Sequence, residues 1–161
     1  MITALFSLAS AQDTTQGFKT VTAWKFNLSY KVEGQNLIGK VSCETKGWLA
    51  IGFNPTKVMK NANIIIGYAD SNSSVLVDQF GTGMMEHQPD TAVGGKNNII
   101  DGKCTEENGI TTLSFTIPLD SGDPKDVKIV PGQKTKVIFA CGAKDDFASK
   151  HVKTAKTEIV F

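Results

Sequence analysis

Apolar and polar residues alternate along residues 22–32, and this period of two predicts a half-buried strand. The apolar side of this strand carries Trp24, Phe26, Leu28 and Tyr30. The Glu-Gly-Gln-Asn sequence at 33–36 predicts a turn, and the apolar pattern of residues 37–45 predicts a second strand. The two strands together predict a hairpin.

The rest of the chain repeats this arrangement of short apolar stretches separated by Gly, Pro, Asn and Asp. Further strands are predicted at residues 48–53, 62–68, 74–80, 110–117, 136–141 and 155–161. Residues 81–98 predict a long loop, and the best helical candidate is one or two turns at residues 145–150. Many short strands at this spacing predict an all-β fold, an immunoglobulin-like antiparallel β-sandwich with long loops.

The N-terminal residues differ in character from the rest. Residues 2–8 form a short apolar run, and Ala9-Ser10-Ala11 resembles a small-x-small cleavage site. We interpret residues 1–11 as the remnant of a signal peptide and residues 12–161 as one domain, which predicts export to the periplasm or the extracellular space. A frayed apolar tail is the alternative. No stretch of 18 apolar residues occurs, so we expect no membrane span in the mature chain.

Charge and motif content exclude several classes of function. The formal net charge is +1, and all 17 basic residues are lysine, which argues against nucleic acid as a partner. No GxSxG, HExxH, P-loop or GxGxxG motif is present, so we expect no enzyme activity. The three cysteines, Cys43, Cys104 and Cys141, allow either one disulfide and one free thiol or a set of buried free thiols.

Met59 and His151 are the most informative candidates for chemistry. Each lies in a predicted loop at the end of a strand, where β-sandwich proteins place their sites. Met59 is flanked by lysine in a polar run, so a purely hydrophobic role is not obvious. His87 is a rival to His151, and Met84 and Met85 are alternative thioethers.

Several separated blocks of the sequence resemble DOMON domains. Residues 47–53 (GWLAIGF) and 59–68 (MKNANIIIGY) resemble the family's Gly-Phe strand, methionine loop and following strand. Residues 80–100 and the run ending at His151 resemble the haem-binding branch of the family, which is similar to the cytochrome subunit of ethylbenzene dehydrogenase. The resemblance covers roughly residues 18–161, and Asn63 departs from it because many members have Asp there.

The resemblance implies a b-type cytochrome domain that passes single electrons. Carried over to this sequence, Met59 and His151 would be the axial ligands of haem b. Such ligation fills both axial positions of the iron and raises its potential. The haem would pack on Trp48 and Phe53, and on Ile51, Ile65 or Phe139. Lys150, or else Lys57, Lys60 or Lys153, would meet a propionate. The partner would be a redox protein or a membrane electron-transfer component.

Two other functions stay open at this point. The same fold could bind a carbohydrate or another small ligand, with Trp24, Trp48 or Tyr68 stacking on sugar rings. Trp24 and Trp48 alternate with apolar residues, however, and we expect both to be buried. A structural exported domain without a cofactor is the third alternative, since fold alone does not settle function.

Overall fold

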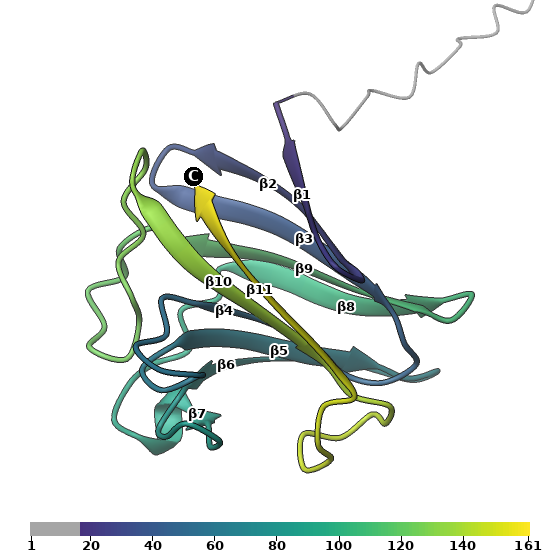
Figure 1. Cartoon of the computed structure of the whole chain (residues 1–161). Coiled ribbons are helices and arrows are strands. Elements are labelled where there is room, and N and C mark those ends of the chain that lie inside the picture. Colours follow the sequence, from purple (N-terminus) through teal and green to yellow (C-terminus); the bar gives the residue numbers. More distant parts are fainter. Residues whose placement is uncertain (1–16) are drawn as a thin grey trace, which may run out of the picture.

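The computed structural model describes residues 17–161, so the predicted signal remnant at residues 1–11 lies outside the described residues. Two antiparallel sheets pack face to face (Figure 1). The five-stranded sheet has the order β1-β2-β3-β9-β8 and the six-stranded sheet the order β11-β10-β4-β5-β6-β7. This confirms the predicted all-β sandwich.

The first sheet begins with the predicted hairpin. Its strands are β1 (Lys19–Ala23), β2 (Phe26–Glu33), β3 (Asn36–Glu44), β8 (Asp101–Glu107) and β9 (Ile110–Pro118). In β2, Phe26, Leu28 and Tyr30 point into the core, as the alternation predicts. β8 was not predicted, because its sequence DGKCTEE is polar and it forms the edge of the sheet next to β9.

Trp24 departs from the predicted strand. Ala23 pairs with Phe26, so Trp24 and Lys25 form the two-residue turn between β1 and β2. Trp24 has a φ of 54° and is 62% exposed. The prediction that it is buried is therefore wrong, because a residue in a tight turn leaves the alternation of the strands on either side.

The second sheet carries the longer loops. Its strands are β4 (Leu49–Phe53), β5 (Asn63–Ala69), β6 (Ser74–Phe80), β7 (Gln88–Pro89), β10 (Lys134–Cys141) and β11 (Lys153–Val160). A short 3-10 helix, η1 (Asp90–Ala92), follows β7. Residues 145–150 contain no helix, because the Asp146 carboxylate accepts hydrogen bonds from the backbone N–H groups of Ala148 and Ser149. This Asx turn competes with helical hydrogen bonding.

The core lies between the two sheets and is rich in aromatic residues. Phe26 stacks on Phe139 at a centroid distance of 5.5 Å, and Phe53 meets Phe115 edge-on at 6.1 Å. These pairs join strands of opposite sheets, so they hold the two layers together. Within residues 17–161, no helix is long and apolar enough to cross a bilayer.

Candidate functional site

The six-stranded sheet is apolar on the face turned away from the core as well as on the core face. In β4, Leu49, Ile51 and Phe53 point into the core, so Ala50 and Gly52 point outward. A second buried cluster forms on this outward side, which we call the outer face. It consists of Trp48, Ala50, Ala62, Ile64 and Ile66, with Met59, Tyr68, Val77, Ile138, Ala140 and Phe147 packed against it.

This second cluster is unusual for an outward side of an antiparallel sheet. Such a face is ordinarily solvated and polar. Here Ala50 pairs with Ala140 on one side and with Ile66 on the other, so small side chains lie at the middle of the face. Branched side chains border them, and Ile64 and Ile66 are 5% and 1% exposed because two loops cover the face. The six-stranded sheet is therefore apolar on both of its faces.

The first covering loop, residues 54–62, connects β4 to β5 and carries Met59. Asn54, Val58 and Asn61 all have positive φ, and a β-branched residue such as Val58 rarely adopts this conformation. The loop is tied to the end of β6 by hydrogen bonds from Asn61 N to Gly81 O (2.7 Å) and from Gly81 N to Ala62 O (2.9 Å). Strain held in place by surrounding contacts is typical of functional loops. Met59 is half-buried against the outer face.

The second covering loop, residues 142–152, connects β10 to β11 and carries His151. The indole N–H of Trp48 donates to both the carbonyl oxygen and Oγ of Ser149, each at 3.2 Å. Phe147 packs edge-on against Tyr68 at a centroid distance of 5.0 Å. Lys150 and His151 are exposed beside this anchor. The loop is therefore fixed to the outer face while its basic residues stay at the rim.

The two covering loops lie at opposite ends of the sheet (Figure 1). Phe53 pairs with Asn63 at the end where residues 54–62 emerge, and Leu49 pairs with Cys141 at the end where residues 142–152 emerge. The loops that carry Met59 and His151 therefore border the outer face at its two ends, with Met59 and Phe147 as the residues packed against it. Neither residue type nor spacing in the sequence could place them so.

His87 lies at the margin of the same face, at the Met59 end. Its Nδ1 is hydrogen-bonded to Oε1 of Gln79, whose β6 position pairs with Ile64. Gln79 supplies an acceptor, so Nδ1 carries the proton and Nε2 is left with its lone pair. Burial lowers the pKa of His87, which favours the neutral ring.

The structure separates the residues predicted to pack on a haem into two groups. Trp48 lies on the outer face with Met59, whereas Phe53 is fully buried in the core between the sheets. Ile51, Ile65 and Phe139 also lie in that core. The outer face therefore lacks these four side chains. The residues that sequence reasoning missed are Phe147 and the small pair Ala50 and Ala140.

Comparison with known proteins extends this description. The model of the DOMON domain family matches residues 22–142. Among solved structures, the cytochrome b domain of pyranose dehydrogenase from Coprinopsis cinerea has a TM-score of 0.58 at 13% identity, covering 83% of this chain and 75% of that chain. The cytochrome domain of cellobiose dehydrogenase from Myriococcum thermophilum has a TM-score of 0.55 at 11% identity, covering 88% and 80%.

Proposed function

This chain belongs to the DOMON domain family, and from that premise we propose that its outer face binds a b-type haem and that the protein carries single electrons. The observation that carries the proposal is the second apolar cluster, covered from its two ends by the Met59 loop and the His151 loop. The two solved structures of similar fold are cytochrome domains, which supports the proposal.

The residues on the loops that border the outer face would suit a haem. A haem bound by a thioether and an imidazole supplies one-electron chemistry with no open coordination position. Met59 has no proton to lose, and it is already half-buried against the apolar cluster. His151 would present a neutral ring nitrogen and donate its other N–H to an acceptor. Trp48, Ala50 and Ile66 would exclude water, and Lys150 would meet a propionate at the rim.

The arrangement of the loops supports His151 over His87 as the second ligand. Axial ligands approach iron from opposite sides of the macrocycle. Met59 and His87 lie at the same end of the outer face, where residues 54–62 and β6 end. His151 lies at the other end, so the Met59 and His151 loops can hold a flat group between them. In this proposal His87 positions its own loop through Gln79.

The remaining parts of the proposal concern location and partners. We propose that the protein is exported to the periplasm or the extracellular space, and that it exchanges electrons with a redox protein or a membrane component rather than catalysing a reaction. The similarity to the cytochrome subunit of ethylbenzene dehydrogenase stays a prediction from the sequence blocks.

Spectroscopy of the protein with added haemin tests the proposal. We expect stoichiometric uptake with a low-spin Soret band and a sharp α-band on reduction. His151→Ala should lose the sharp α-band, while His87→Ala, the matched control, should keep it. Failure of wild-type protein to take up haemin would refute the proposal. Loss of the α-band in His87→Ala with retention in His151→Ala would refute the ligand assignment.

Binding of a carbohydrate or another small ligand is the second candidate. Of the three aromatic residues considered for sugar stacking, Trp48 is buried and Tyr68 packs against Phe147, which leaves Trp24. Trp24 is 62% exposed at the β1–β2 turn, and that exposure is the observation that favours this function. A glycan-binding screen of wild-type protein and Trp24→Ala would test it.

A further inference from the structure

Three carboxylates from separate segments converge beside β6. Asp78 lies in β6, Asp90 in η1, and Asp126 in the connection between β9 and β10. One carboxylate oxygen from each lies within 4.8 Å of the other two. Asp78 is 3% exposed and Asp90 is 0% exposed, so the cluster is buried rather than spread over the surface.

The carboxylate oxygens of this cluster divide into two sets. Oδ2 of Asp78 accepts from Asn98 N at 2.8 Å, and Oδ2 of Asp126 accepts from Asn98 Nδ2 at 2.9 Å. The Oδ1 atoms of Asp78 and Asp126 and both carboxylate oxygens of Asp90 are buried without any hydrogen-bond partner. Asn98 therefore holds two of the carboxylates by one oxygen each, and each of these two keeps a buried oxygen without a partner, as does Asp90.

Lys125 compensates these charges only in part, because its charge lowers the pKa of Asp90 but burial outweighs this effect. No ion pair within residues 17–161 involves Asp78, Asp90 or Asp126. Lys125 Nζ lies over the ring of Phe80, 4.9 Å from its centroid. Burial raises the pKa of Asp78 and of Asp90 to about 7, which is the expected response to uncompensated negative charge. Buried carboxylates in such a group are ordinarily paired or bound to a metal ion.

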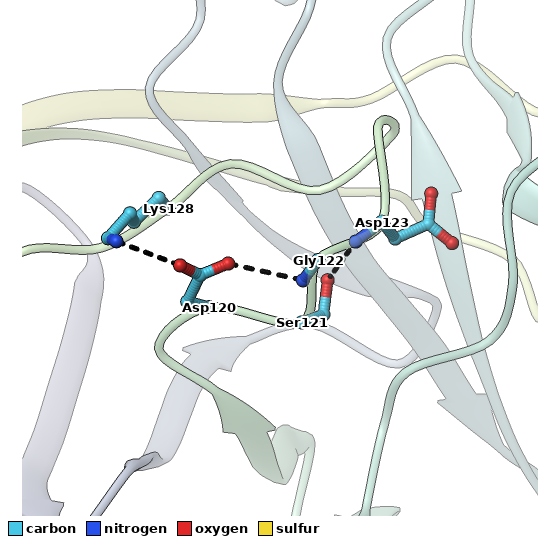
Figure 2. A network of polar contacts seen from close by, with 5 residues as sticks. All are labelled: Asp120, Ser121, Gly122, Asp123 and Lys128. Atoms are coloured by element: carbon cyan, nitrogen blue, oxygen red, sulfur yellow. Dashed lines mark hydrogen bonds and ion pairs between the residues drawn. The ribbon is translucent and has the colours of Figure 1, made fainter.

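In the loop that carries Asp126, the other acidic residues stabilise the backbone (Figure 2). Asp120 pairs with Lys128 Nζ at 2.8 Å and accepts from Gly122 N at 3.1 Å. Ser121 Oγ accepts from Asp123 N at 3.0 Å. The Asp123 carboxylate in turn accepts from Lys96 N and Lys125 N, at 2.7 and 2.9 Å. Asp120 and Asp123 thus accept hydrogen bonds from backbone N–H groups, whereas Asp126 keeps one oxygen without a partner.

We propose that Asp78, Asp90 and Asp126 bind one Ca²⁺ ion that joins β6, η1 and the β9–β10 connection. Carboxylate oxygens are the ligands that hard divalent cations prefer. Ca²⁺ binds oxygen at about 2.3–2.6 Å, so its ligands can stand roughly 5 Å apart, whereas Mg²⁺ at about 2.1 Å requires them within roughly 4.2 Å. The three oxygens lie within 4.8 Å of one another, a separation that one Ca²⁺ ion can span. The site is independent of the proposed haem function.

Calorimetry and thermal unfolding of haem-free protein test the proposal. The protein is stripped with EGTA, desalted, and titrated with CaCl₂ at pH 8. We expect one saturable site with Kd of roughly 10⁻⁵ to 10⁻³ M, a Tm that rises with Ca²⁺, and a smaller response to Mg²⁺. Asp90→Asn should weaken Ca²⁺ binding at least tenfold. In EGTA, its Tm should equal or exceed that of wild type, because the substitution removes a buried charge.

Asp120→Asn is the matched control, since Asp120 lies in the same loop and is half-exposed in its pair with Lys128. Its Ca²⁺ affinity should stay within twofold of wild type. The absence of saturable binding to wild type would overturn the proposal and leave a cluster of protonated carboxyls. Equal loss of binding in Asp90→Asn and Asp120→Asn would also overturn it, because it would indicate diffuse attraction to an acidic surface.

Discussion

The Sγ atoms of Cys43 and Cys141 lie 3.6 Å apart in the core, where they join the two sheets of the sandwich. Cys43 belongs to β3 and Cys141 to β10, 98 positions apart in the sequence. The hydrogen bond shared with Cys141, and then burial, raise the pKa of the Cys43 thiol. Cys104, also buried, lies in β8. All three cysteines are buried free thiols in the structure, and Cys43 and Cys141 are the two whose sulfur atoms are in contact.

Oxidative refolding should convert this pair into a disulfide and leave Cys104 as a thiol. The bond would close a loop of 98 positions, which by loop entropy stabilises the fold by up to about 4–5 kcal/mol. Mass spectrometry should show the loss of two hydrogen atoms and one cross-linked peptide pair. Cys104→Ala should behave as wild type, and any cross-link that includes Cys104 would contradict the prediction.

Gly81→Ala should displace the Met59 loop. A Cβ at Gly81 would lie 1.8 Å from the carbonyl oxygen of Met59, a backbone atom that cannot rotate away. We expect a loss of about 1–3 kcal/mol in unfolding free energy and at least tenfold weaker haemin uptake. Gly83→Ala is the control, because its Cβ would meet nothing closer than 3.6 Å. Equal haemin affinity in the two variants would show that the loop position is not needed for binding.

Trp48→Phe should release the His151 loop. Phenylalanine keeps an aromatic ring but cannot donate to Ser149 O and Oγ, which share the single indole N–H of Trp48. Such a shared hydrogen bond contributes about 1 kcal/mol. Amide hydrogen exchange across residues 142–152 should become faster, as should tryptic cleavage after Lys150. Trp24→Phe, at an exposed turn of the other sheet, should change neither rate. Unchanged exchange in Trp48→Phe would argue that the loop is held by its backbone contacts alone.

Stability without Ca²⁺ should fall as the pH rises from 5.5 to 8. Burial raises the pKa of Asp90 to about 7, so the folded protein holds a proton that the unfolded chain releases near pH 4. The stabilising proton is therefore lost as pH rises toward and through 7, at roughly 1.4 kcal/mol per pH unit for each carboxyl. Asp78 contributes in the same direction.

His87 opposes this trend, since burial lowers its pKa and disfavours folding at low pH. Asp90→Asn isolates the effect, because asparagine does not titrate. Thermal unfolding in EGTA should show the Tm of wild type falling relative to that of Asp90→Asn between pH 5.5 and 8. A constant difference across this range would contradict the prediction.

Local alternation predicted most strands of this protein correctly, because a strand's period of two depends on near neighbours in the chain. This prediction failed where the conformation of a residue depends on a turn or on pairing with another strand. Trp24 follows the apolar alternation but lies in a turn, and β8 has no apolar pattern yet pairs along β9. An Asx turn at Asp146 is present where one or two helical turns were predicted, at residues 145–150.

Only the tertiary structure shows which face of the six-stranded sheet each residue occupies. The run WLAIGF is apolar at nearly every position, so its sequence indicates burial on both sides without saying which side is the core. The structure turns Phe53 inward and Ala50 outward, so the two residues lie on opposite faces of the sheet. The predicted ligands Met59 and His151 stay a hypothesis that spectroscopy can test.

The sequence by itself determined the β-sandwich fold and the absence of common enzyme motifs. Its prediction of one domain with two loop residues as iron ligands stays a prediction. The tertiary structure alone decided that the loops of Met59 and His151 border one apolar face, that Cys43 meets Cys141, and that Asp78, Asp90 and Asp126 share a buried space. The physical reason is that the hydrophobic period of a segment shows only which of its own faces is buried. The meeting of distant side chains depends instead on strand order and register.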